Sequence, residues 1–314
     1  MTLSLLRTCS IALLLVAGCS RQQDLSEGGK KTLAEGRQGF ATHLIRREKT
    51  RAPVPLPPPN LFRIVYNPAP IGAMPAYLGP PPRDGRKHPA IIWIFGGFDN
   101  SINEAAWEPG PRANDQSARA FREAGIITMF PSLRGGNLNP GWLEGLYGEA
   151  DDILAAAAFL RHQPGVDPDR IYLGGHSTGG TLALLVAEHT NLFRAVFAFG
   201  AVSDVRGYGP DHLPFDVANH QETDLRAPVK WLNAIRTPTF VFEGANRDSN
   251  IGELRIMARA NRNPLVHFHP VKGADHFSVL QPVTRLIATK MLADDGPAAN
   301  LTFTDAELAD AMRL

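Results

Sequence analysis

Short apolar segments alternate with longer amphipathic segments from residue 61 to about residue 293. Several of the short segments are hydrophobic at consecutive positions, which is typical of strands buried on both faces. Because strand and helix patterns alternate, we predict an α/β fold with a mostly parallel, eight-stranded sheet and helices on both faces. The predicted strands are residues 62–66, 74–78, 90–95, 126–130, 170–173, 194–199, 237–242 and 265–269, and the predicted helices are residues 112–124, 149–162, 178–189, 250–261 and 277–292.

The two ends of the chain depart from this alternation. Residues 294–314 contain a capping box, Thr304 to Glu307, which predicts one short amphipathic tail helix. At the other end, Arg7 precedes a short apolar run and small residues up to Cys19, the pattern of a secretory signal. The apolar run is too short to cross a bilayer comfortably, since about 20 residues are needed.

The segment Val16-Ala17-Gly18-Cys19 resembles the lipobox of bacterial lipoproteins. The resemblance implies that residues 1–18 are removed, that Cys19 is lipidated, and that the protein is anchored in the bacterial cell envelope on the extracytoplasmic side. An ordinary signal peptide cut elsewhere, or a short anchor, are the alternatives. Residues 19–60 then predict a tether that is Pro-rich at 53–60, although an arm packed on the domain remains open for those eight residues.

Composition narrows the classes of function. The 32 Lys and Arg residues nearly balance the 31 Asp and Glu residues, so no basic surface favours a nucleic-acid partner. The only cysteines are Cys9 and Cys19, which excludes thiol catalysis and a Cys-ligated metal in the processed domain. We predict no metal and no cofactor. Three acids at the start of a predicted helix favour its N-terminal end rather than a metal site: Glu149, Asp151 and Asp152.

The strongest local motif is G-x-S-x-G from Gly175 to Gly179, with Ser177 at its centre. A predicted strand precedes the motif and a predicted helix follows it, which is the setting of a nucleophile elbow. Side chains two residues before and after the serine would collide on such a turn, which explains both glycines. We therefore predict Ser177 as the nucleophile.

A serine hydroxyl needs a base at neutral pH. His276 lies in a loop after the last predicted strand, at the edge of the sheet where parallel α/β folds place their chemistry. His176 adjoins the serine and is expected to point away from it, and His267 and His269 are expected to be structural. We predict His276 as the base.

An acid that orients the base should follow the preceding strand. That segment offers Asp248 in the loop and Glu243 at the strand end. We favour Asp248, because a short side chain in the loop has the freedom to meet the imidazole, and keep Glu243 as the rival. Asp275 adjoins His276 and is a poor candidate.

Acyl transfer also needs donors for a developing oxyanion. The main-chain amide of Thr178 is one predicted donor. The second is expected from the turn after the strand at 90–95, where Gly96-Gly97-Phe98 is similar to the His-Gly-Gly turn of esterases with Phe95 in place of His. We favour Phe98, and Gly97 remains open.

Residues 61–292 resemble the catalytic domain of the prolyl oligopeptidase family of α/β-hydrolases. The resemblance rests on Gly96-Gly97-Phe98, on Glu149 to Leu160, on Val166 to Gly180, on Asp248, and on Ala274 to Phe277. It implies an α/β-hydrolase domain at 61–293 and a serine peptidase or free-standing esterase. Peptidases of that family usually carry a large propeller, for which the roughly 40 residues before the first strand leave no room.

Three functions compete at this point. The first is a carboxylic ester hydrolase on small or medium substrates, the second a peptidase or amidase, and the third a catalytically silent lipoprotein that binds ligands. The cap is predicted to be minimal, since about 37 residues separate the strands that flank it. Within it, Leu225 to Ile235 predicts a helix, and Tyr208, His212 and Phe215 either line a pocket or pack within the loop.

Overall fold

The computed structural model describes residues 31–313, which belong to one compact unit. The predicted signal peptide and Cys19 lie outside these residues. No helix between residues 31 and 313 is long and apolar enough to cross a membrane.

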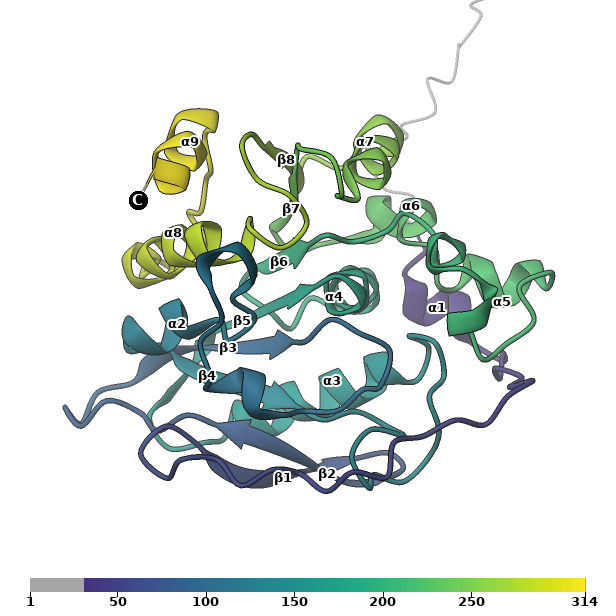
Figure 1. Cartoon of the computed structure of the whole chain (residues 1–314), viewed down its shortest axis with the longest axis horizontal. Coiled ribbons are helices and arrows are strands. Elements are labelled where there is room, and N and C mark those ends of the chain that lie inside the picture. The colour runs from purple at the N-terminus through teal and green to yellow at the C-terminus, as the bar shows by residue number, and fades with distance from the viewer. Residues whose placement is uncertain (1–30, 314) are drawn as a thin grey trace, which may run out of the picture. The chain divides into compact units, whose positions relative to one another are not determined.

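A single eight-stranded sheet organises the unit, with the order β1-β2-β4-β3-β5-β6-β7-β8 (Figure 1). The β1–β2 and β2–β4 pairs are antiparallel, and the strands from β4 to β8 are parallel to one another. The predicted mostly parallel α/β sheet is therefore confirmed. The strands are β1 (Arg63–Ala69), β2 (Gly72–Leu78), β3 (His88–Ile94), β4 (Ile127–Pro131), β5 (Val166–His176), β6 (Val196–Phe199), β7 (Thr239–Gly244) and β8 (Val266–Val271).

Helices bury an apolar core on each face of the sheet. One core joins the sheet to α1, α3, α4 and α7, and the other joins it to α2, α8 and α9. Strands apolar at consecutive positions are required for this arrangement, because both of their faces are covered. The α-helices are α1 (Leu33–Arg37), α2 (Arg119–Glu123), α3 (Glu149–Leu160), α4 (Thr178–His189), α5 (His220–Asp224), α6 (Pro228–Trp231), α7 (Ile251–Ala260), α8 (Leu280–Ala293) and α9 (Asp305–Arg313).

The helix predicted at 112–124 is wrong in its first half. Residues Arg112–Asn114 form only a 3₁₀ turn, and α2 begins at Arg119. The Asp115 carboxylate accepts hydrogen bonds from both the amide and the hydroxyl of Ser117, and Ala118 has a left-handed φ of 46°. Local side-chain bonds of this kind compete with a continuous helix.

Two other helices are shorter than predicted. α8 begins at Leu280 rather than at residue 277, because the Asp275 carboxylate binds the amides of Phe277 and Ser278 and holds them in a turn. The helix expected from Leu225 to Ile235 is reduced to α6, which starts at Pro228, and a 3₁₀ turn. The tail helix α9 is confirmed, with the Thr304–Glu307 capping box in place.

Residues 31–60 pack on the domain. They include the unpredicted helix α1, which starts with its own capping box from Thr32 to Glu35. Further along, Leu44 forms an antiparallel bridge with Phe215, and the amide of Thr50 donates to the carbonyl of Gly135. The Pro-rich stretch is fixed as well, since the Tyr77 hydroxyl donates to the Pro55 carbonyl at 2.8 Å. Within the described residues, the packed arm replaces the expected tether.

The arm docks onto a buried guanidinium. Arg226 is fully buried and pairs with Glu222. The same guanidinium donates to the hydroxyl of Thr42 in the arm at 2.6 Å and lies 4.0 Å from the ring centroid of Phe215. Burial of a charge is tolerated where an opposite charge, hydrogen bonds and an aromatic face surround it. Phe215 therefore packs within the loop, which settles one of the alternatives left open by the sequence.

Candidate active site

Ser177 occupies the turn between β5 and α4 with φ 57° and ψ −118°. Backbone conformations of this kind are costly and occur where the surrounding structure imposes them. Here the crowding is direct: a Cβ on Gly175 would lie 2.4 Å from the carbonyl oxygen of Gly179, and one on Gly179 would lie 2.4 Å from that of Ile94. Ser177 is partly exposed, whereas its neighbours from Ile171 to Gly180 are buried. The turn thus has the geometry expected of a nucleophile elbow.

His276 lies in the loop between β8 and α8, as expected. Its Nδ1 is 3.0 Å from Oε2 of Glu243, which is 1% exposed at the end of β7. The Glu243 carboxylate also accepts hydrogen bonds from the amides of Gly244 and Asn250. A carboxylate held in this way keeps the proton on Nδ1 and leaves the lone pair on Nε2, the arrangement that a general base requires.

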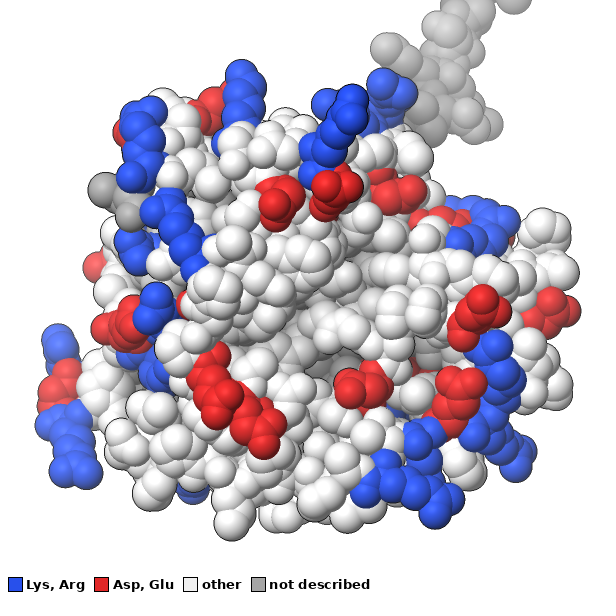
Figure 2. Space-filling model, in the orientation of Figure 1, with Lys and Arg blue, Asp and Glu red and all other residues white. Residues whose placement is uncertain are grey.

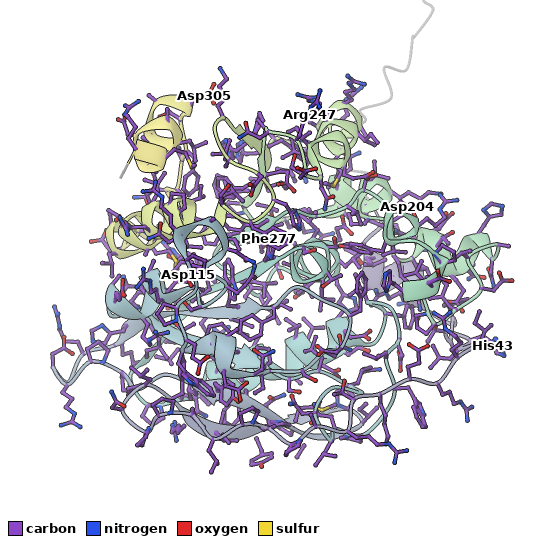
Figure 3. The ribbon with its side chains drawn as sticks, viewed as in Figure 1. His43, Asp115, Asp204, Arg247, Phe277 and Asp305 are labelled. Carbon is purple, nitrogen blue, oxygen red and sulfur yellow. The ribbon has the colours of Figure 1, made fainter. Side chains whose placement is uncertain are left out.

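The expectation for Asp248 is wrong: the carboxylate at His276 is Glu243. Asp248 is exposed in the loop between β7 and α7, with φ 65°, and does not contact the imidazole. Figure 3 labels its neighbour Arg247 at the outer edge of the molecule, beside α7. The loop leads the chain outward, so the acid that remains within reach is the longer side chain on the strand itself.

Gly200, which sequence reasoning missed, makes room for this pair. It follows β6 with φ 64°, and a Cβ there would lie 2.3 Å from Cε1 of His276 and 3.2 Å from Oε2 of Glu243. The available signal was a glycine directly after a buried strand, at the same edge of the sheet as the serine.

The predicted oxyanion turn and α4 are linked by a side-chain hydrogen bond. The Thr178 hydroxyl donates to the carbonyl of Gly97 at 2.6 Å, and Gly97 has φ 101°. Because C=O and N–H point in opposite directions in a trans peptide, this contact also fixes the direction of the Phe98 amide. Thr178 is the first residue of α4, whose N-terminus favours negative charge. The structure thus places both predicted donor segments beside Ser177.

No hydrogen bond joins the Ser177 hydroxyl to another residue in the range 31–313. Catalytic hydrogen bonds are often longer in the free enzyme than with substrate bound.

A cleft of about 640 Å³ opens at Ser177, and Figure 2 shows this face hollowed near its centre. Phe98 and Phe277 are about 40% exposed at its edge. Figure 3 labels Phe277 on the loop after β8, near Asp115 on the loop that precedes α2. The cleft is lined by Phe95, Gly96, Gly97, Phe98, Asp99, Ser101, Asn103, Ala105, Gln116, His176, Ser177 and Phe277, among which Asp99 is the one residue with a formal charge at neutral pH.

A smaller pocket of about 70 Å³ shares Gly97 and Phe98 with the cleft. Tyr208 and His212 line it, which identifies them as pocket residues. The Phe98 ring stacks on His212 with centroids 4.1 Å apart and meets Tyr208 edge-on at 5.3 Å. Tyr208 and His212 of the minimal cap thus contact Phe98, which lines the cleft at Ser177.

His267 and His269 have structural surroundings, as expected. His269 stacks on Phe242, and burial lowers its pKa to about 4. His267 stacks on Phe240, and burial lowers its pKa as well. Glu149 and Asp152, considered above as possible metal ligands, instead bind Asn100 and Arg134.

The sequence pattern that defines the prolyl oligopeptidase family matches residues 113–279. The uncharacterized peptidase YtmA of Bacillus subtilis (strain 168) is 26% identical over 149 residues, which are 42% of this chain and 55% of that protein. The match therefore spans about half the length of this relative.

Two solved structures illustrate the range of similar folds. A puromycin-hydrolyzing peptidase of Mycobacterium tuberculosis has a TM-score of 0.59 at 20% identity, over 74% of this chain and 39% of that one. An esterase of the archaeon Pyrobaculum calidifontis has a TM-score of 0.55 at 16% identity, over 75% of this chain and 86% of that one. At such identities these likenesses establish the α/β-hydrolase fold alone. The family match includes Ser177, Glu243 and His276 and covers more than half of the sequence. The chain therefore belongs to the prolyl oligopeptidase family of serine hydrolases.

Proposed function

We propose that this protein hydrolyses carboxylic esters of small or medium size through an acyl-enzyme on Ser177. The observation that carries the proposal is the Glu243–His276 contact beside an elbow serine that faces an open cleft. The three residues come from three segments of the chain and meet at the carboxyl edge of the sheet. This convergence supports catalysis over the competing role of a silent binding protein.

The proposed reaction has two halves. His276 Nε2 accepts the Ser177 proton as Oγ attacks the ester carbonyl, and the imidazolium then donates that proton to the departing alkoxide. Water, deprotonated by the same nitrogen, attacks the acyl carbonyl; the bond from the acyl carbon to Ser177 Oγ then breaks, the imidazolium returns the proton to Oγ, and the carboxylic acid is released. Glu243 keeps the Nδ1 proton in place and stabilises the imidazolium. Main-chain amides at Thr178 and in the Gly97–Phe98 turn are the proposed oxyanion donors.

The preference for esters follows from the cleft. Its lining is mainly aromatic and small neutral residues, with few groups to hold an extended peptide in register. An alkoxide also leaves more easily than an amine. The esterase above is matched over 86% of its length, whereas the puromycin-hydrolyzing peptidase is matched over 39%. The shared fold therefore accounts for most of that esterase and for less than half of that peptidase.

Peptide or amide hydrolysis is the second candidate. The observation in its favour is that relatives found by sequence and by structure carry the name peptidase. The same Ser177, His276 and Glu243 would serve, with the proton going to an amine.

Matched p-nitrophenyl esters and p-nitroanilides, including aminoacyl ones, distinguish the two candidates. We expect the esters to show the greater acceleration of kcat/KM over the uncatalysed rate. A greater acceleration of the anilides would replace the ester proposal with the peptidase. Labelling by a fluorophosphonate that is lost in Ser177→Ala separates either enzyme from a silent binding protein.

We also propose that Cys19 is lipidated and that the protein is held in the bacterial cell envelope. The support is the lipobox-like segment described above, which lies outside the described residues. Each buried CH₂ of an acyl chain contributes about 0.8 kcal/mol, and stable anchoring takes more than one chain. Mass spectrometry of the mature N-terminus tests this, and an unmodified N-terminus at another residue would refute it.

A further inference from the structure

His176 precedes the nucleophile and is 1% exposed, yet both of its ring nitrogens have polar partners. Nε2 lies 3.0 Å from the main-chain carbonyl oxygen of His276, and Nδ1 lies 3.1 Å from Oε1 of the Gln116 side-chain amide. Its ring centroid is 4.5 Å from that of His276 and 5.4 Å from that of Phe277. As predicted, the imidazole does not serve as the base of the adjacent serine. It contacts the base residue instead.

The hydrogen-bond directions follow from chemistry. A carbonyl oxygen only accepts, so Nε2 of His176 carries the proton and donates to His276. In the neutral ring Nδ1 then has only a lone pair, so Gln116 must present its NH₂ group in place of Oε1, an exchange of O and N that leaves the atom positions unchanged. Because the other end of the Gln116 amide lies 2.6 Å from Oδ1 of Asn114, the exposed Asn114 amide is exchanged in the same way and donates to Gln116. The ring stays neutral because burial, and then repulsion by His276, lower the pKa of His176 to about 3.

We propose that His176 is a positioning residue for His276, and that Gln116 holds His176 in that role. The inference rests on the proposed function, since it assigns a partner to the proposed base. Glu243 fixes the ring of His276 from one side, while His176 fixes its main chain from the other. Two anchors on different atoms set both the place and the orientation of the imidazole. Because Gln116 and His176 both line the cleft, substrate in the cleft lies against this same pair.

The elbow leaves space for this contact. A Cβ on Gly96 would lie 3.3 Å from Nδ1 of His176 and 3.1 Å from Cβ of Ser177, so the neighbouring turn stays close without displacing either. One short segment thereby carries the nucleophile and a support for its base. The distance between Ser177 and His276 is then set through adjacent residues rather than across the whole sheet.

The test compares His176→Phe, which keeps a ring but removes the donor, with His176→Gln, which restores an N–H. We expect His176→Phe to lower kcat by about 10- to 100-fold, as a small misplacement of a catalytic group does, with KM changed less than about threefold. His176→Gln should recover part of this loss. Gln116→Leu should lower kcat in the same direction by a smaller factor.

The pH profile supplies a readout that a merely structural role would not move. The titratable groups that face His276 are Glu243 from β7, His176 from β5 and Asp275 from its own loop. A loosened base loop weakens the Glu243 contact and stabilises the imidazolium less. The acid limb of the rate profile should therefore move to lower pH in His176→Phe.

A matched control is His162→Phe. His162 also contacts a main-chain carbonyl, that of Ala158 at 2.8 Å, but it is exposed at the end of α3. We expect this variant to keep wild-type kcat and pH profile. An unchanged kcat and profile in His176→Phe, or equal losses in the two variants, would overturn the positioning role.

A further readout does not depend on turnover. The proton NMR signal of His276 Nδ1–H, identified by its loss in Glu243→Gln, should exchange faster in His176→Phe and return toward wild type in His176→Gln. If the wild-type protein is not labelled by a fluorophosphonate, the proposed function fails, and this signal still decides the positioning role. If labelling succeeds but the exchange rate is unchanged in His176→Phe, the positioning role alone fails.

Discussion

The elbow around Ser177 and the loop after β7 are two regions of one active site with opposite physical origins. At the elbow, main-chain crowding leaves glycine as the residue that fits at 175 and 179. After β7, the local sequence is compatible with either Glu243 or Asp248 as the acid. The contact with His276, 33 residues beyond Glu243, selects Glu243. The steric requirement at the elbow can be recognised in the residues next to Ser177. The choice of acid depends instead on the paths of loops that are distant in the sequence.

Removal of the nucleophile is expected to have the largest effect on activity. We expect Ser177→Ala to lower kcat by about 10⁴ to 10⁶, as in comparable triads. The fold should be retained, since alanine fits wherever serine does at this turn. Turnover of the best ester, with circular dichroism as the folding control, measures it. A variant that keeps more than about a tenth of wild-type kcat would place the chemistry elsewhere.

The choice of acid is tested by two matched substitutions. Glu243→Gln should lower kcat by about 10⁴, because the imidazole loses the partner that sets its tautomer. Asp248→Asn should leave kcat near wild type, because Asp248 is exposed and does not contact His276. Steady-state kinetics of both folded variants decides the question. The reverse ranking would return the role to Asp248.

Gly200 is crowded by the catalytic pair in the same way. Gly200→Ala places a methyl group against the His276 ring at a residue with φ 64°, so we expect kcat to fall by about 10² and the unfolding free energy to fall by about 1–3 kcal/mol. The control is Gly252→Ala in α7, where a Cβ meets no atom within 4 Å. Alanine there should raise helix stability by up to about 1 kcal/mol. Equal effects of the two substitutions would contradict the argument.

The smallest expected effect concerns the link between elbow and oxyanion turn. Thr178→Val removes the hydroxyl that holds the Gly97 carbonyl, and a neutral hydrogen bond contributes about 1 kcal/mol. We expect kcat to fall about fivefold, with Thr178→Ser close to wild type. Binding of a boronic acid should weaken in parallel in Thr178→Val. If valine and serine variants behave alike, the hydroxyl has no part in shaping the turn.

Features that depend on repeating sequence patterns were predicted correctly. The eight strands, α3, α4, α7 and α9 follow from apolar periodicity and capping, and the elbow follows from its glycines. The failures share a different cause. The turn at Asp115 and Ser117 interrupts an otherwise helical pattern, and helix α1 is only five residues long in a segment that reads as polar.

The arm of residues 31–60 illustrates the physical reason why such segments are not predicted from the sequence. Its hydrophobic and polar positions carry no strand or helix period, because it is held by scattered contacts to the carbonyls of Pro214 and Gly135 and to Arg226. Non-periodic contacts between residues far apart in the sequence leave no local signature. The choice of Glu243 as the acid of the site belongs to the same class.

The long sequence separation of the arm's contacts also affects when the arm can fold during synthesis. Thr42 binds Arg226, which is synthesised 184 residues later, and Arg37 binds the carbonyl of Leu225, which is synthesised 188 residues later. At synthesis rates of about 5–20 residues per second, the ribosome needs roughly 10–40 s to supply those partners. The first part of the described chain to leave the ribosome thus reaches these partners only after residue 226 has been made. During that interval the nascent arm is open to other proteins.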